Sequence, residues 1–207
     1  MHPPNGCAQR PGRNGIFGDG RGAPSPVHYG KGYVNAFWDG TKMTYGDGDG
    51  VEFGPLVSLD VAGHEMSHGV TETTAGLTYS GESGGLNEAT SDIFGSMVEF
   101  YAVNAADPAG YLIGEEFDLA GHQGLRRLDD PIADGSSPNC WSANTKNLDV
   151  HYSSGVGNHF FYLLAEGSGA KTIGGVATAP RPATARRSPA SVATRPRGSG
   201  SGRWTST

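Results

Sequence analysis

The 207-residue sequence lacks any run of apolar residues long enough to span a bilayer, which argues against a membrane protein. Cysteine is scarce as well. Only Cys7 and Cys140 occur, far apart in the sequence, so they neither define a disulfide framework nor indicate the redox compartment. The first residues lack the apolar core of a signal peptide, so any secretion signal would have to lie upstream of this chain.

Acidic residues are absent from position 176 onward. All 21 Asp and Glu residues precede it, with nine of the 15 Lys and Arg residues, so the formal charge of residues 1–175 is 9 minus 21, or −12. This acidity argues against nucleic acid as a partner and indicates either bound cations or a solvated face that aids solubility. Residues 176–207 are rich in Pro, Arg, Ser and Gly, which predicts a basic, disordered, low-complexity tail.

The predicted elements are strands first and helices afterwards. Residues 27–38, rich in β-branched and aromatic side chains, and residues 41–45 flank Asp39-Gly40, a pattern that predicts a hairpin. The GDGDG run at 46–50 predicts a Gly-rich turn, because the other ligand positions of a calcium loop are missing. Helices are predicted over 57–73, 86–103 and 155–166, and a Gly- and Ser-rich linker over about 74–85. This order is typical of an α+β fold with a mainly helical second half.

Apolar residues recur at helical spacing in each predicted helix, so each is expected to have one apolar face. These residues are Val57, Val61, Met66 and Val70 in the first helix and Ile93, Phe94, Met97, Val98 and Tyr101 in the second. The third helix is expected to bury Val156, Phe160, Leu163 and Leu164.

The sequence HEMSH places His64 and His68 one above the other on a helix face, where two imidazoles can share a tetrahedral zinc ion. Glu65 lies beside them. The alternative is a chance occurrence of this short pattern on an ordinary amphipathic helix. A catalytic zinc ion needs a third protein ligand, and Glu88, twenty residues after His68, supplies one on the next predicted helix. Asp92 follows one turn later and is expected to accept the other N–H of His64.

The spacing also separates kinds of zinc protease. Proteases with a third His ten residues after the first are excluded, because Thr74 and Thr71 occupy their His and Gly positions. Aminopeptidases with a glutamate ligand generally place it one residue earlier, where this chain has Asn87. The alternative for Glu88 and Asp92 is a solvated acidic helix face.

Three successive motifs, DVAGHEMSHGVTE, SGGLNEATSDIFG and DVHYSSGVGNHFFYLLA, resemble the thermolysin family of secreted bacterial neutral metalloproteases, and within it the actinobacterial members. The resemblance covers about residues 13–175. It implies a thermolysin-like α+β fold in four parts: a remnant of a β-rich N-terminal domain over 1–56, a central zinc-binding helix over 57–73, a partial helical C-terminal domain over 74–175, and the tail over 176–207.

The resemblance implies a Zn²⁺ ion bound by His64, His68 and Glu88. Glu65 would be the general base and later the proton donor to the leaving amine. The chemistry agrees, because zinc lowers the pKa of its water and a carboxylate that hydrogen-bonds this water can take its proton at neutral pH.

Three further residues match family positions at the reacting carbonyl. Tyr79 and His151 match the pair that donates hydrogen bonds to the oxyanion, and Asp149 matches the carboxylate that orients the His151 ring. Taken alone, Tyr79 would be a packing residue, His151 a surface histidine and Asp149 a turn residue.

The resemblance also implies how a protein or peptide substrate binds. Asn35 and Ala36 would contact the backbone of an extended peptide that adds to an edge strand. Arg126 would grip the substrate carbonyl just after the cut; its alternative is a surface ion pair with Asp129 or Asp130. The apolar pocket for the side chain after the cut would be formed by Val61, Ile113, Phe117 and Leu125, whose alternative is core packing. Cleavage before a large apolar residue follows.

Calcium is the second implied metal. Asp60, Glu99 and Glu115 match family Ca²⁺ ligands, and the acid excess suits a hard cation. Gly110 stands where the family usually supplies an Asp, and Asp107 is a candidate substitute. The alternative for all of these residues is an acidic surface.

The resemblance implies a secreted, extracellular protein made with a propeptide, which is expected to be absent from this chain, and further helices after 175 that would carry a partner for Cys140. The leading hypothesis is therefore a zinc-dependent endopeptidase. The alternative is a truncated, catalytically inactive fragment that binds zinc or peptide. A structural zinc module is disfavoured, because only three protein ligands are evident and Glu65 lies beside the water position.

Overall fold

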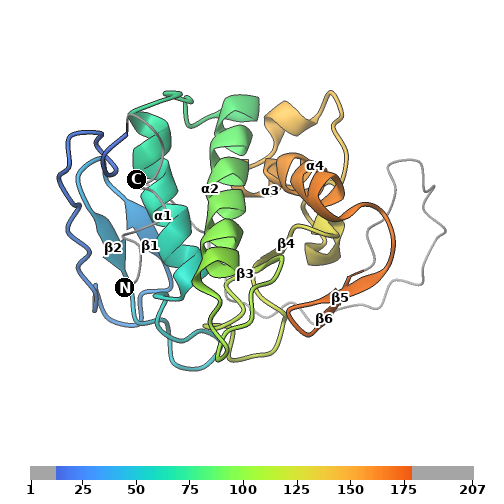
Figure 1. Cartoon of the computed structure of the whole chain (residues 1–207), viewed down its shortest axis with the longest axis horizontal. Coiled ribbons are helices and arrows are strands. Elements are labelled where there is room, and N and C mark those ends of the chain that lie inside the picture. The colour runs from blue at the N-terminus through green and yellow to red at the C-terminus, as the bar shows by residue number, and fades with distance from the viewer. Residues whose placement is uncertain (1–12, 179–207) are drawn as a thin grey trace.

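A computed structural model describes residues 13–178 of the chain, so the predictions for Cys7 and for the tail beyond Thr178 lie outside the described residues. Figure 1 shows helices α1 and α2 side by side at the centre, with the β1–β2 hairpin on one side and α3 and α4 on the other. The elements in chain order are β1 (Ala36–Trp38), β2 (Met43–Tyr45), α1 (Leu59–Glu72), α2 (Gly81–Ala102), β3 (Leu112–Ile113), β4 (Arg126–Arg127), the 3-10 turns η2 (Pro131–Asp134) and η3 (Thr145–Asn147), α3 (Val150–Ser153), α4 (Gly155–Glu166), β5 (Lys171–Ile173) and β6 (Val176–Thr178).

The predicted hairpin is confirmed, with β1 antiparallel to β2 and Trp38 opposite Met43. Its strands have three residues each, so the β-rich character expected of residues 1–56 is wrong for the described part of that range. Side chains satisfy the backbone there in place of strand partners. The Asp49 carboxylate, for example, accepts hydrogen bonds from the backbone N–H groups of residues 51, 52 and 53.

The two central helices approach very closely where two glycines face each other. A Cβ atom on Gly63 would lie 3.1 Å from the Cα atom of Gly95, and one on Gly95 would lie 2.5 Å from the Asp60 carbonyl oxygen. Larger residues would therefore push the helices apart. This close packing brings the HEMSH segment of α1 within side-chain reach of α2.

Helix α2 begins at Gly81, so the linker predicted over 74–85 is too long at its C-terminal end. Glycine disfavours helix formation, but packing outweighs that preference here. Gly84 lies so close to α3 that a Cβ atom would stand 2.4 Å from a methyl group of Val150. Helix α1 begins at Leu59, two residues after the predicted start, and α4 has the predicted bounds.

Two hydrophobic clusters form the core. The first joins the hairpin to α1 and consists of Ile16, Ala36, Met43, Tyr45, Leu56, Val61 and Phe117. The second joins β3 and the segment after β4 to α4 and consists of Tyr111, Ile113, Leu128 and Tyr162. The α+β order is thus confirmed, with small two-stranded sheets around a helical centre.

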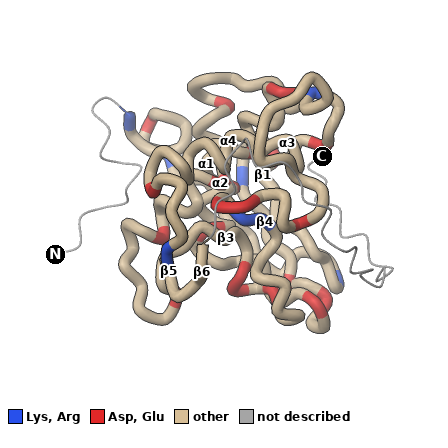
Figure 2. Tube along the Cα trace, turned by 90° about the vertical axis from the view of Figure 1, so that its right-hand side faces the viewer, with Lys and Arg blue, Asp and Glu red and all other residues tan. Residues whose placement is uncertain are grey.

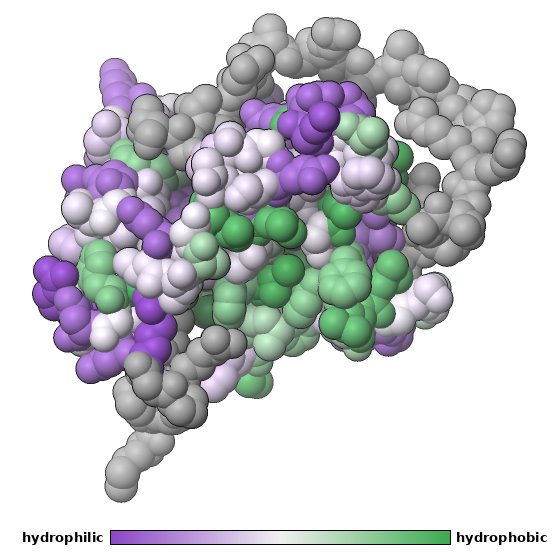
Figure 3. Space-filling view, turned by 90° about the horizontal axis from the view of Figure 1, so that it is seen from above, coloured by the Kyte–Doolittle hydropathy of each residue, from purple (hydrophilic) through white to green (hydrophobic). Residues whose placement is uncertain are grey.

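The predicted apolar faces of α2 and α4 are confirmed only in part. Ile93 and Leu163 pack against the second cluster. Phe160 is 68% exposed and Leu164 is 74% exposed, and Phe94, Met97 and Tyr101 of α2 are exposed as well. Polar side chains share the inward faces, among them Glu88, Asp92, Glu99, Asn158 and His159. Helical spacing of apolar residues therefore identified only part of the inward face. Apolar side chains also gather on the face shown in Figure 3.

The hairpin β5–β6 turns at Gly174-Gly175, whose φ values of 58° and 80° suit a two-residue turn. Its end is fastened to α4, because the Tyr162 hydroxyl donates to Thr178 Oγ1 at 2.7 Å. Residues 176–178, which the sequence placed in the tail, therefore belong to the ordered fold. The predicted start of the tail at 176 is therefore at least three residues too early.

Acidic positions outnumber basic ones in the view of Figure 2, in keeping with the charge of the sequence. None of the helices described is long and apolar enough to cross a membrane. Cys140 is a free, partly buried cysteine within the described residues.

Candidate active site

Three side chains from the two central helices meet at one point. His64 and His68 lie one turn apart on α1, with their Nε2 atoms 3.0 Å from each other. Glu88 of α2 approaches both, with 3.5 Å from Oε2 to His64 Nε2 and 3.4 Å from Oε1 to His68 Nε2. One ligand atom from each of the three residues lies within 4.8 Å of the other two. This is the grouping that HEMSH and Glu88 predicted.

Hydrogen bonds fix both imidazole rings from behind. His64 Nδ1 lies 2.8 Å from Asp92 Oδ1, and His68 Nδ1 lies 2.8 Å from Asn87 Oδ1. Since Nδ1 of each ring faces a hydrogen-bond acceptor, both Nε2 atoms are turned towards Glu88. Oxygen Oε2 of Glu88 is buried without a hydrogen-bond partner. Two Nε2 atoms and a buried carboxylate oxygen fit the three protein ligands of a catalytic zinc site.

The electrostatics of the group also suit a cation. Burial opposes the charged form of His64, but Glu88 and Asp92 outweigh it and raise the pKa of this ring to about 9. Burial and the neighbouring His64 charge lower the pKa of His68 to about 4. Burial disfavours the Glu88 carboxylate, yet the surrounding histidines lower its pKa. The carboxylates thus hold a positive charge at this point, and a metal ion can take the place of the proton.

Glu65 lies on α1 beside these groups and is 2% exposed. Burial raises its pKa to about 7, although the His64 charge and the backbone N–H of Trp38 act in the opposite direction. The contact with Trp38 ties Glu65 to strand β1. A carboxyl group that titrates near neutrality is suited to exchange protons with a reacting molecule.

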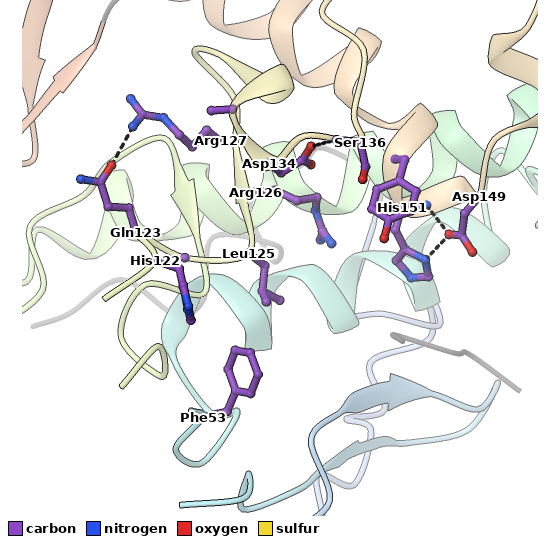
Figure 4. A pocket seen from close by; sticks show the side chains of 13 residues that line it. Phe53, His122, Gln123, Leu125, Arg126, Arg127, Asp134, Ser136, Asp149 and His151 are labelled. Carbon is purple, nitrogen blue, oxygen red and sulfur yellow. Dashed lines mark hydrogen bonds and ion pairs between the residues drawn. The ribbon is translucent and has the colours of Figure 1, made fainter. Parts of the chain in front are cut away.

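Tyr79 and His151 come from distant segments to the same place. The Tyr79 hydroxyl donates to Glu88 Oε1 and lies 3.3 Å from His151 Nε2. The other ring nitrogen of His151 lies 2.7 Å from Asp149 Oδ1, which also accepts from the His151 backbone N–H as the N-cap of α3 (Figure 4). The cap and the ring contact use the same oxygen, so the helix start orients the histidine.

Arg126 does not form the surface ion pair that the sequence left open. It is 6% exposed, and its Nε and Nη2 atoms donate to the two oxygens of Asp92 at 2.7 and 2.6 Å. Asn158 of α4 donates to the same carboxylate at 2.8 Å, and Asp129 binds Arg127 instead. No local sequence pattern predicts this role of Asn158, because its partner lies 66 residues away.

A cavity of about 450 Å³ opens beside His151. In Figure 4 it extends from His151 and Asp149 past Arg126 to Leu125, Phe53 and His122. A second hollow of about 420 Å³ borders His68 and Tyr79 and is also lined by Trp38 and Glu72. Open space thus borders the metal-ligand group on two sides.

The residues expected to bind substrate lie at different depths. Leu125 and Arg126 line the cavity. Val61 and Phe117 belong to the first core cluster and Ile113 to the second, each nearly inaccessible. Asn35 and Ala36 are buried next to the hairpin, where β1 pairs only with β2 within the described sheet. The Phe117 ring and Leu125 both lie against Gly114, and the Leu125 backbone N–H donates to the Ile113 carbonyl oxygen at 2.7 Å.

A second acidic group lies where calcium was expected, with a different membership. Glu99, Asp107 and Glu115 place ligand oxygens within 4.8 Å of one another. Asp60 is not a member; it accepts hydrogen bonds from the backbone N–H groups of Val61 and Gly114. Both oxygens of Glu99 and one of Glu115 are buried without hydrogen-bond partners. Burial raises the pKa of Glu99 to about 9 and of Glu115 to about 7. Asp107, the candidate substitute for the position of Gly110, is thus a member of this group.

Comparison with known proteins covers almost the whole described chain. Residues 8–72 match the family model "Thermolysin metallopeptidase, catalytic domain", and residues 75–183 match "Thermolysin metallopeptidase, alpha-helical domain". The chain is 61% identical over 168 residues to a transglutaminase-activating metalloprotease of Streptomyces mobaraensis, an alignment that covers 80% of this chain and 22% of that protein. It is 46% identical over 162 residues to a thermolysin of Alicyclobacillus acidocaldarius, which covers 75% of this chain and 29% of that protein.

A solved structure, the precursor of protealysin, a metalloproteinase from Serratia proteamaculans, is similar with a TM-score of 0.64 and 41% sequence identity. The match covers 74% of this chain and 52% of that one. The chain thus spans less than a third of the curated relatives above and about half of the solved one. With both family models matched in order and the metal-ligand group assembled between them, the chain belongs to the thermolysin family of metallopeptidases.

Proposed function

We propose that this chain carries the active site of a zinc-dependent endopeptidase that hydrolyses peptide bonds in protein or peptide substrates. The observation that carries the proposal is the convergence of His64, His68 and Glu88, with Glu65 buried beside them and Tyr79 and His151 at the same point. Because the chain spans only part of its relatives, the activity of the whole protein is part of this proposal.

His64, His68 and Glu88 would hold the zinc ion, which when bound lowers the pKa of water and polarises a carbonyl group. Glu65 takes a proton from the attacking water and returns it to the leaving amine. Its raised pKa of about 7 supports both steps, because a base and an acid are equally available near that pH.

Tyr79 and His151 would donate hydrogen bonds to the oxyanion that develops on the scissile carbonyl. Asp149 accepts from Nδ1–H of His151, so this ring donates through Nε2 when it is protonated.

Substrate would bind as an extended strand along β1, at Asn35 and Ala36, with Arg126 directed at the carbonyl after the cut. Leu125 would receive the side chain after the cut, with Ile113, Phe117 and Val61 packed behind the pocket. This arrangement supports a preference for a large apolar residue at that position. We also propose a propeptide and export from the cell, as expected of a family relative whose solved form is a precursor.

The test is hydrolysis of casein and of internally quenched peptides by the purified chain, with and without a zinc chelator. We expect activity that the chelator removes and zinc restores. Stoichiometric zinc binding without hydrolysis under any of these conditions would favour the inactive fragment, which the exposed apolar faces of α2 and α4 also suit.

The Asp92→Asn variant is expected to bind zinc about 10- to 100-fold more weakly, because Asp92 orients the His64 ring. It should also be less stable by about 3–5 kcal/mol, because Arg126 would remain buried without its counter-charge. Zinc titration and urea unfolding measure the two effects. Asn87→Ala removes the His68 contact and a hydrogen bond to the Leu77 carbonyl but leaves no buried charge unpaired, so this control should weaken zinc binding without the large loss of stability. Unchanged zinc affinity in both variants would contradict the orienting role.

We further propose a calcium ion bound by Glu99, Asp107 and Glu115, and we expect calcium to raise the melting temperature. A ligand that binds only the folded state stabilises it by about 2.7 kcal/mol at a concentration 100 times its Kd. The measurement is thermal unfolding across a calcium titration. Asp107→Asn should reduce the shift, whereas Asp134→Asn, outside the group, should keep it. If calcium does not change the melting temperature of the unaltered protein, the site is excluded.

A further inference from the structure

His122 lies at the far end of the cavity and has no part in the chemistry proposed above. In Figure 4 it stands with Phe53 and Leu125 at the end opposite His151 and Asp149, with Arg126 between the two ends. Its side chain is 43% exposed, so a molecule in the cavity can reach it.

A buried carboxylate holds this histidine in place. Asp118, whose side chain is 2% exposed, lies 3.1 Å from His122 Nδ1 and accepts hydrogen bonds from the backbone N–H groups of Ala120 and Gly124. Asp118 is itself bridged to Phe53 by backbone pairing. The loop that carries His122 is thus fastened at both ends, which favours a fixed ring over a mobile surface side chain.

The contact with Asp118 determines whether Nε2, the other ring nitrogen, donates or accepts a hydrogen bond. The carboxylate accepts from Nδ1–H, so Nε2 is a hydrogen-bond acceptor while the ring is neutral and a donor once it is protonated. Among the described residues Nε2 has no recorded hydrogen-bond partner. A substrate group could therefore satisfy it.

We infer that His122 is a specificity-determining residue that hydrogen-bonds, through Nε2, a polar side chain at the second residue after the cut. The inference rests on the proposed function, which places the first residue after the cut at Leu125 and Arg126. An extended chain advances about 3.3 Å per residue, so the next residue continues along the cavity towards Phe53 and His122. The Phe53 ring offers an apolar wall for the stem of that side chain, and His122 contacts its polar end.

The His122 ring would discriminate between substrate side chains because some of them leave its Nε2 atom without a hydrogen bond. An apolar side chain at this position would displace water from Nε2 without replacing its hydrogen bond, which is unfavourable. Glutamine donates to the neutral ring, whereas glutamate accepts only from the protonated ring. The other charged groups lining the cavity have partners of their own, namely Arg126, Arg127, Asp134, Asp149 and His151.

The experiment compares kcat/KM for three quenched peptides that differ only at the second residue after the cut, with Gln, Glu or Leu there. For the unaltered chain we expect Gln to exceed Leu by roughly 5- to 10-fold. Glu, whose carboxylate cannot donate a hydrogen bond to Nε2, should fall below Gln at pH 8.

His122→Leu should reverse the preference for Gln over Leu and remove the difference between Gln and Glu. The control is His28→Asn, since His28 is an exposed histidine paired with Asp47 outside the cavity, and both ratios should persist in it. Equal ratios in His122→Leu and the unaltered chain would overturn the inference while leaving peptide hydrolysis, and so the proposed function, intact. Absence of hydrolysis for all three peptides would overturn both.

Discussion

Replacing Glu65 with glutamine is expected to lower kcat for peptide hydrolysis by about 100- to 10,000-fold while zinc remains bound. Glutamine is close in size and can keep the contact with the Trp38 backbone, but it cannot take a proton from water. Glu65 is also not one of the three residues whose ligand atoms converge, so zinc content should not change. Steady-state kinetics and zinc analysis of the purified variant measure the two effects.

The matched control is Glu82→Gln, because Glu82 is an exposed residue on α2 that accepts from Trp141 Nε1 and is not one of the three converging ligand residues. It should retain full activity. The acid side of the pH profile gives a further check. Burial raises the pKa of Glu65 to about 7, and zinc would act in the opposite direction, so activity should fall as pH drops below about 7 or somewhat lower. Activity of the Glu65 variant within tenfold of the unaltered chain would exclude its role as the base.

Replacing Glu88 with alanine is expected to remove both stoichiometric zinc and activity. Glu88 is fully buried and approaches both histidines, so the variant keeps only two of the three ligand residues. Because zinc binds the folded site and contributes its binding free energy to folding, the loss should also lower the melting temperature.

A chelator supplies the decisive comparison for Glu88. It should lower the melting temperature of the unaltered chain and leave that of Glu88→Ala unchanged, since this variant has no zinc to lose. Glu72→Ala, on α1 and exposed, should respond to the chelator as the unaltered chain does. An equal response in Glu88→Ala would show that zinc is held without this residue.

Local sequence patterns predicted much of the fold, but they failed where packing set the outcome. The hairpin at Asp39-Gly40 and the bounds of α4 follow from turn chemistry and helix spacing, which act over a few residues. The early start of α2 depends on the contact of Gly84 with α3, and the inward faces of α2 and α4 depend on which neighbours cover them. Periodicity indicates that a helix has an apolar side. It does not indicate which side neighbouring elements will cover.

The zinc ligands were the most predictable part of the site, because His64 and His68 lie on one helix and Glu88 and Asp92 on the next. The second acidic group was less predictable. Asp107 joins Glu99 and Glu115 in it, whereas Asp60 does not and accepts a hydrogen bond from the backbone N–H of Gly114, 54 residues away. Arg126 and Asn158 bind Asp92 from 34 and 66 residues away, and no local sequence pattern predicts such a contact.

The sequence by itself therefore determined the metal chemistry and the family, since both depend on residue types at fixed short spacings within helices. Only the tertiary structure decided which residues complete the hydrogen-bond network behind His64. It also decided which residues form the second acidic group and that His122 faces the cavity. These features join segments that lie far apart in the chain. Their geometry is set by the close crossing at Gly63 and Gly95 and by the loops that pack around it, and so by contacts that no local pattern encodes.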